Sequence, residues 1–126
     1  MNWFLFIAGL FGAFTTAGHF TMGSKNYLKP MMDASFDEVP KKVMHCVFHY
    51  VSAYLVLSTA VLFALGIGIN FQVNTTLLVR FIAVNYAIFA ITQIIIALTS
   101  KIPSGIAKLF QWMLFIVVAV LAWVGA

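Results

Sequence analysis

Long apolar stretches with no charged residue are the feature that most constrains how this chain can fold. The stretch from Val43 to Val79 contains no Lys, Arg, Asp or Glu, and residues 1–24, 81–100 and 109–126 are also free of them. A transmembrane helix needs about 20 mainly apolar residues to cross roughly 30 Å of hydrocarbon. Only 8% of the residues are charged, whereas soluble domains carry about 25%. The sequence therefore predicts an integral membrane protein.

The apolar stretches predict a single all-α domain, a bundle of four transmembrane helices that covers residues 1–126. The expected spans are about 2–22, 42–69, 76–98 and 105–124. Between the first and second spans, Pro30 and its apolar neighbours predict a short interfacial segment in the headgroup layer. The uncharged turn from Asn70 to Thr76 predicts that the second and third spans are antiparallel neighbours.

Small residues recur along the first span at intervals of three and four positions. Gly9, Gly12 and Thr16 fall on one face of the predicted helix. Small side chains allow the backbone of a second helix to come close. We therefore expect this face to be a helix packing surface.

The lysines predict the orientation of the chain in the membrane. All six Lys lie in or beside the connections that follow the first and third spans, and the second connection has none. Cytoplasmic connections carry an excess of Lys and Arg, so we expect those two connections in the cytoplasm. In a bacterial inner membrane, the location we expect, both termini would then be periplasmic. Because topology accounts for the net charge of +4, that charge does not indicate a nucleic-acid partner.

The three histidines are the candidate metal ligands. His19 lies about one turn from the cytoplasmic end of the first span, and His45 and His49 lie within about two turns of the same end of the second. A spacing of four residues puts His45 and His49 on one helix face, where they can share a metal ion. His19 from the neighbouring helix would complete a three-histidine site with an open position.

Several metals and cofactors fit this pattern. Zinc or copper is the expected ion, and haem held between His19 and a second-span histidine is the weaker alternative. Sulfur ligands at the same membrane level would favour copper(I): Met22, Met31, Met32, Met44 and Cys46. Carboxylates in the first connection would accept hydrogen bonds from the ligating histidines: Asp33, Asp37 or Glu38.

Structural roles are the competing interpretation of these polar residues. The histidines could hydrogen-bond to hydroxyl or backbone groups of a neighbouring helix and fix the bundle. Arg80, near the outer end of the third span, either extends its charge to the interface or anchors an anionic lipid or substrate group. The single cysteine, Cys46, excludes a dithiol oxidoreductase that works through an internal cysteine pair.

The expected function is that of a small, non-enzymatic membrane protein whose cytoplasmic-side histidine cluster binds a metal ion or a small ligand. An ionisable residue inside a membrane helix is by default a functional candidate. Two alternatives stay open, a redox or enzyme subunit that binds haem or metal, and a structural or assembly partner without a site. The expected partners are the lipid bilayer and either further copies of the chain or another membrane protein.

Two short motifs carry a family resemblance. Gly12-Ala13-Phe14 leads to His19 at the end of the first span, and Phe48-His49 occurs near the start of the second. In these motifs and in its layout the chain resembles the YgdD-like family of small four-span bacterial inner-membrane proteins of unknown function. The resemblance implies a compact four-helix bundle and no established activity.

Overall fold

The structure, a computed structural model, describes residues 1–126 and contains helices but no strands. Its elements in chain order are α1 (Trp3–Gly18), the π-helix η1 (His19–Leu28), α2 (Lys29–Asp33), α3 (Glu38–Gly66), α4 (Thr75–Thr99), α5 (Gly105–Lys108) and α6 (Gln111–Gly125). The all-α prediction is therefore confirmed.

Three helical stretches are long and apolar enough to cross a membrane. They are Trp3–Asp33 with 31 residues, Glu38–Gly66 with 29 and Thr75–Thr99 with 25. The fourth apolar helix, α6, has 15 residues, which is fewer than the about 20 that a span needs. The structure thus has the helices of a polytopic membrane protein, and a fourth span stays a prediction.

The first helix continues beyond the span expected at 2–22. Through α1, η1 and α2 it is helical without interruption as far as Asp33, so the segment expected in the headgroup layer is a continuation of this helix. Proline in an α-helix clashes with the carbonyl four residues earlier. Here the backbone N–H of Lys29 bonds to the carbonyl of Ser24, the wider π pattern. This wider turn just before Pro30 relieves the clash, and the helix continues.

The last expected helix, 105–124, is broken in two instead of being continuous. Leu109 leaves the helical region with φ −101° and ψ 57° and separates α5 from α6. The indole Nε1 of Trp112 donates to the carbonyl of Ile106 at 3.0 Å and partly satisfies the broken turn. Gly105 is required at the start of α5, because a Cβ there would lie 2.8 Å from the carbonyl oxygen of Ala97. The short helix therefore folds tightly onto the end of α4.

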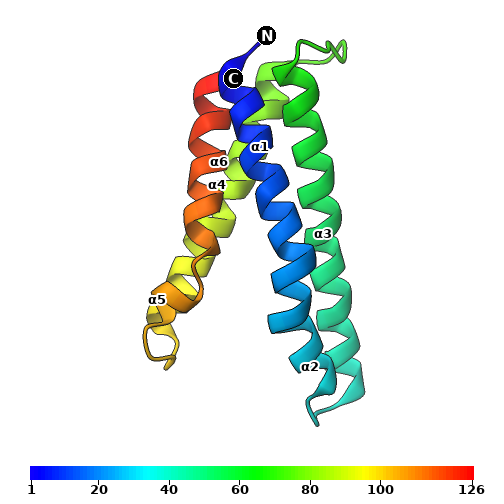
Figure 1. Ribbon diagram of the computed structural model, residues 1–126, viewed down its shortest axis with the longest axis vertical. Helices are drawn as coiled ribbons and strands as arrows, with labels where there is room; N and C mark the ends of the chain where they lie inside the picture. Colours follow the sequence, from blue (N-terminus) through cyan, green and yellow to red (C-terminus); the bar gives the residue numbers. More distant parts are fainter.

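The long helices form two pairs, α1 with α3 and α4 with α6, and α1 also packs against α6. The pairs meet at the end of the molecule that holds both termini and diverge toward the end that holds α2 and α5 (Figure 1). We expected α3 and α4 to be close neighbours, and they do run antiparallel. They touch mainly through side chains, such as the hydroxyls of Ser58 and Tyr86 at 3.0 Å.

Small residues make the close packing between α1 and α3 possible, as the sequence predicted. A Cβ on Gly12 would lie 2.7 Å from Oγ1 of Thr59, and one on Gly9 would lie 2.9 Å from the ring of Phe63. Asn2 closes the same end of the molecule. Its backbone N–H donates to the carbonyl of Gly66, and its side-chain Nδ2 donates to the carbonyl of Gly125, each at 2.8 Å. Three helices are therefore fastened together at the end with the termini.

Candidate functional site

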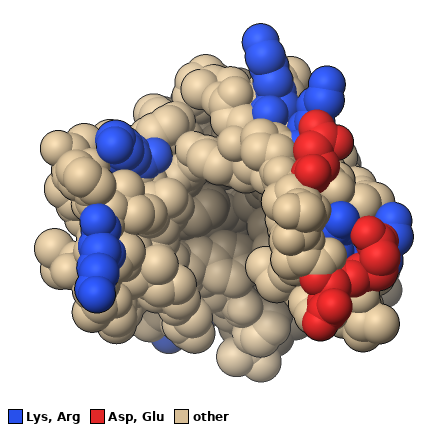
Figure 2. Space-filling model, turned by 90° about the horizontal axis from the view of Figure 1, so that it is seen from below, with Lys and Arg blue, Asp and Glu red and all other residues tan.

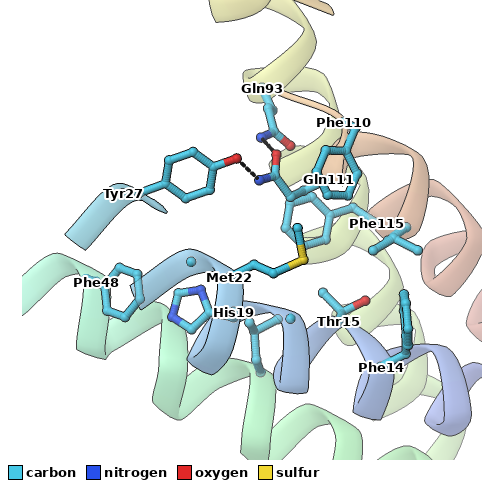
Figure 3. Close-up of a pocket in the computed structure, with 14 residues that line it drawn as sticks. Phe14, Thr15, His19, Met22, Tyr27, Phe48, Gln93, Phe110, Gln111 and Phe115 are labelled. Atoms are coloured by element: carbon cyan, nitrogen blue, oxygen red, sulfur yellow. Dashed lines mark hydrogen bonds between the residues drawn. The ribbon is translucent and has the colours of Figure 1, made fainter. Parts of the chain in front are cut away.

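A cavity of about 300 Å³ lies where the two helix pairs diverge. Its wall combines residues of α1, η1 and α3 with residues of α4 and α6 and with Phe110 between α5 and α6 (Figure 3). The volume is at the lower end of the range of about 300–1,000 Å³ that small-molecule sites occupy. The divergence of the pairs, a property of the tertiary fold, thus creates the candidate site.

The cavity changes in polarity along its length. Because α1 and η1 run toward the lysine-bearing end and α6 runs back from it, position in the chain gives depth. The deep end is lined by aromatic and aliphatic side chains, among them Phe14, Leu55 and Phe115. The end near the lysines carries Tyr27, Gln93 and Gln111. The hydroxyl of Thr15, the polar group at the deep end, donates to the carbonyl of Phe11 at 2.7 Å. The amide and phenol groups of the wall therefore lie at the end near the lysines, which we call the mouth of the cavity.

A hydrogen-bonded chain of three side chains crosses the mouth. Nε2 of Gln93 donates to Oε1 of Gln111 at 2.6 Å, and Nε2 of Gln111 donates to the hydroxyl of Tyr27 at 3.0 Å (Figure 3). This chain connects α4 and α6 to η1 across the gap between the pairs. Oε1 of Gln93 is buried and has no hydrogen-bond partner. An unpaired buried acceptor costs about 1–3 kcal/mol.

His19 lies in the cavity wall between the apolar and polar ends. Its ring stacks on Phe48, with centroids 4.1 Å apart and planes 18° from parallel. Nε2 lies 2.8 Å from Oγ of Ser52, whose own hydroxyl donates to the carbonyl of Phe48 at 3.0 Å. When the Ser52 proton is directed at Phe48, Nε2 of His19 is the donor in this pair. In the neutral ring Nδ1 then carries the free lone pair.

That lone pair faces the next turn of η1. Nδ1 of His19 lies 3.7 Å from the position of a Cβ on Gly23, another residue of the cavity wall. The absence of a side chain at Gly23 keeps the space beside the imidazole open. His19 and Gln93 are thus the two residues of the cavity wall that have an acceptor without an assigned donor.

The structure does not bring the three histidines together. His45 and His49 approach each other, with their Nε2 atoms 3.1 Å apart, whereas His19 is bonded to Ser52. No group of three or more His, Cys, Asp or Glu side chains is placed to hold a metal ion. Asp33, Asp37 and Glu38, expected to accept hydrogen bonds from the histidines, make none with them, and Glu38 pairs with Lys41 at 2.9 Å.

The remaining predicted residues are divided between the cavity and the surface. Met22 lines the cavity, and Met31 and Met44 line a smaller pocket on the other side of His19 and Phe48. Cys46 is exposed and unpaired. The guanidinium carbon of Arg80 lies 5.3 Å from the ring centroid of Trp123, a cation–π contact. Trp123 is close to the C-terminus, so Arg80 lies at the end of the molecule that holds the termini, away from the lysines (Figure 1).

Charge surrounds the mouth of the hollow unevenly. Seen from the lysine-bearing end, Figure 2 shows basic side chains on both sides of a central hollow and acidic side chains on one side only. The sequence explains the asymmetry, because all three acidic residues lie within 33–38 and none follows Glu38. The rim formed by α5 and its flanking loop carries Lys101 and Lys108 with no acidic neighbour in sequence.

The polar residues at the mouth were not among the predicted site residues. Gln93 and Gln111 were detectable in the sequence only as amides in apolar stretches, and such amides often serve as hydrogen-bonding contacts between helices. Tyr27 lies in a segment expected at the interface. Nothing in the sequence indicated that these three side chains would meet. Comparisons with family models, curated proteins and solved structures find no match to this chain.

Proposed function

We propose that this chain is a non-enzymatic membrane protein that binds an amphipathic molecule in the cavity between its two helix pairs. The buried, unpaired Oε1 of Gln93 is the observation that supports this most strongly. Buried polar groups in folded proteins nearly always have a partner, and an exception calls for an explanation such as a ligand. A donor group of the bound molecule would supply this partner.

The polarity of the cavity supports an amphipathic ligand. The apolar part of the molecule would occupy the deep end, where Phe14, Leu55 and Phe115 line the wall. Its polar part would face Gln93 and His19 nearer the lysines. His19 contributes an acceptor that its hydrogen bond to Ser52 holds in a fixed orientation. This proposal keeps His19 from the expected cluster and assigns it to ligand binding instead of metal binding.

The proposed arrangement in the membrane follows the distribution of charge. Both termini lie at the end opposite α2 and α5 (Figure 1), and the six lysines lie toward the end that holds those two helices. With the lysine-bearing end in the cytoplasm of a bacterial cell, the termini would be periplasmic. In this arrangement α5 and α6 together would make the fourth crossing, and the cavity would open toward the cytoplasmic leaflet.

Replacing Gly18 by phenylalanine tests ligand binding in the cavity. A Cβ on Gly18 meets nothing within 4 Å, and this residue lines the cavity, so the new side chain would fill the space without displacing a neighbour. We expect the purified wild-type protein to retain an amphipathic molecule in native mass spectrometry and Gly18→Phe to lose it. Val56 of α3 is 44% exposed and does not line the cavity, so Val56→Phe is the matched control and should retain it. Equal retention by both variants would refute the cavity as the site.

A second candidate function, metal binding, rests on the geometry of His45 and His49. Two nitrogens bound to one zinc ion at about 2.0–2.1 Å lie roughly 3.3 Å apart in tetrahedral geometry. Nε2 of His45 and Nε2 of His49 are 3.1 Å apart. This pair would supply two ligands, and zinc or copper would take the others from solvent or another molecule.

Calorimetric titration with zinc, on protein purified without a histidine tag, tests this second function. We expect His45→Ala and His49→Ala to reduce the zinc affinity by tenfold or more, on the order of 1.4 kcal/mol. His19→Ala is the control and should bind zinc like the wild type, because His19 is bonded to Ser52 and not to the pair. Wild-type protein that fails to bind zinc would remove this function and leave the cavity proposal unaffected.

A further inference from the structure

The lysines around the mouth of the cavity bear on the chemical class of the ligand. The lysine-bearing end holds all six Lys and all three acidic residues, a formal excess of three positive charges. The only ion pair in the structure joins Lys41 to Glu38. The five other lysines therefore have no carboxylate partner, and basic side chains lie on both sides of the hollow (Figure 2).

The cavity wall and these lysines are adjacent in the chain. Lys108 precedes the lining residue Phe110 by two positions, and Lys25 lies between the lining residues Gly23 and Tyr27. Neither lysine lines the cavity itself, and the basic side chains stand around the hollow, on both sides of it (Figure 2). A group at the mouth would have positive charge on two sides.

We propose that the bound amphiphile has an anionic headgroup, a carboxylate or a phosphate, held at the mouth by lysines of both helix pairs. The order of groups along the cavity matches such a molecule: hydrocarbon against Phe14 and Phe115, a donor against Gln93, and the anion among the lysines. Basic pockets between transmembrane helices recognise lipid headgroups in this way. The inference rests on the proposed cavity function and adds the charge of the ligand.

A pair of probes with the same chain and different charge tests the headgroup. The probes are the N-acylglycine of a fluorescent long-chain polyene fatty acid, which carries both an amide N–H donor and a carboxylate, and its methyl ester, added to the whole protein in a non-ionic detergent at neutral pH. Binding is followed by energy transfer from tryptophan, since Trp112 is next to the lining residue Gln111. We expect the acid to bind at least tenfold more tightly than the ester.

Three variants locate the interaction. Lys101→Gln combined with Lys108→Gln should weaken binding of the acid roughly tenfold, since each lysine near an anionic group contributes several-fold, and should leave the ester unchanged. Arg80→Gln removes a cation that contacts Trp123 instead and should change neither affinity. Gly18→Phe should abolish binding of both probes.

The outcomes separate the two proposals. If acid and ester bind equally and Gly18→Phe blocks both, the anionic headgroup is wrong and the cavity function stands. If neither probe binds, or if Gly18→Phe has no effect, both proposals fail. Millimolar inorganic phosphate should leave the acid bound, because phosphate lacks the chain that fills the cavity. Complete displacement by phosphate would instead identify a site for small anions and overturn the amphiphile.

Discussion

Gly66→Ala is expected to lower the free energy of unfolding by about 2 kcal/mol or more, the cost of overpacking a tight contact. A Cβ at Gly66 would lie 2.6 Å from the backbone nitrogen and 2.7 Å from the Cα of Phe6. Backbone atoms cannot rotate away as a side chain can, so the start of α1 must move from the end of α3. The hydrogen bond from the N–H of Asn2 to the carbonyl of Gly66 would be stretched at the same time.

Gly18→Ala is the matched control for this prediction. Gly18 is also helical, but its added Cβ meets nothing within 4 Å, and alanine is favoured over glycine in a helix by about 0.5–1 kcal/mol. The same substitution should therefore destabilise at Gly66 and stabilise slightly at Gly18. Thermal unfolding in detergent, followed by circular dichroism, measures both. A Gly66→Ala protein as stable as the wild type would show that α1 and α3 do not meet as closely as described.

Gln93→Leu is expected to stabilise the ligand-free protein by about 1–2 kcal/mol and to weaken ligand binding at least tenfold. The gain comes from removing the buried Oε1 that has no partner, an arrangement that costs about 1–3 kcal/mol. Part of this gain is lost because Oε1 of Gln111 loses its donor. The loss of binding follows because the same oxygen is the proposed acceptor for the ligand.

The opposite signs of these two effects are the diagnostic result. Stabilisation at a functional site commonly costs function, whereas a purely structural amide would lose stability when replaced. Asn85→Leu is the control, because the Asn85 side chain donates only to the carbonyl of Phe81 in its own helix. It should leave ligand binding unchanged. Unfolding in ligand-free detergent and affinity for the fluorescent acylglycine, whose amide N–H is the donor, are measured on the same preparations. A less stable Gln93→Leu protein that still binds the probe would contradict the assigned role.

The boundaries of the middle helices were predictable to within a few residues because they depend on local sequence. The expected spans 42–69 and 76–98 correspond to Glu38–Gly66 and Thr75–Thr99. Asp37 and Asn74 occupy the positions before these two helices, and Asn74 accepts a hydrogen bond from the N–H of Leu77 at 2.9 Å. Asp37 makes no such side-chain bond, and the cap at Asn74 is a short-range feature.

The first and last helices differed from prediction because proline and glycine act according to context. Pro30 was expected to open a separate segment, yet a π-helical turn before it lets the helix continue to Asp33. The chain leaves the helical region at Leu109, a residue whose side chain gives no signal of a break. The tight contact between Gly105 and Ala97 depends on how α5 packs against α4, which a pattern along one helix does not contain.

The length of an apolar stretch, which must reach about 20 residues to cross the hydrocarbon, is a property of the sequence alone. The sequence by itself therefore determined the all-helical class, the membrane-length helices and the grouping of the lysines. Only the tertiary structure decided where the site lies. Spacing shows that His45 and His49 share a helix face, but the direction of that face depends on how α1 packs against α3. That packing leaves His19 in the cavity wall, bonded to Ser52, and the packing of α4 and α6 brings Gln93 and Gln111 to the same cavity.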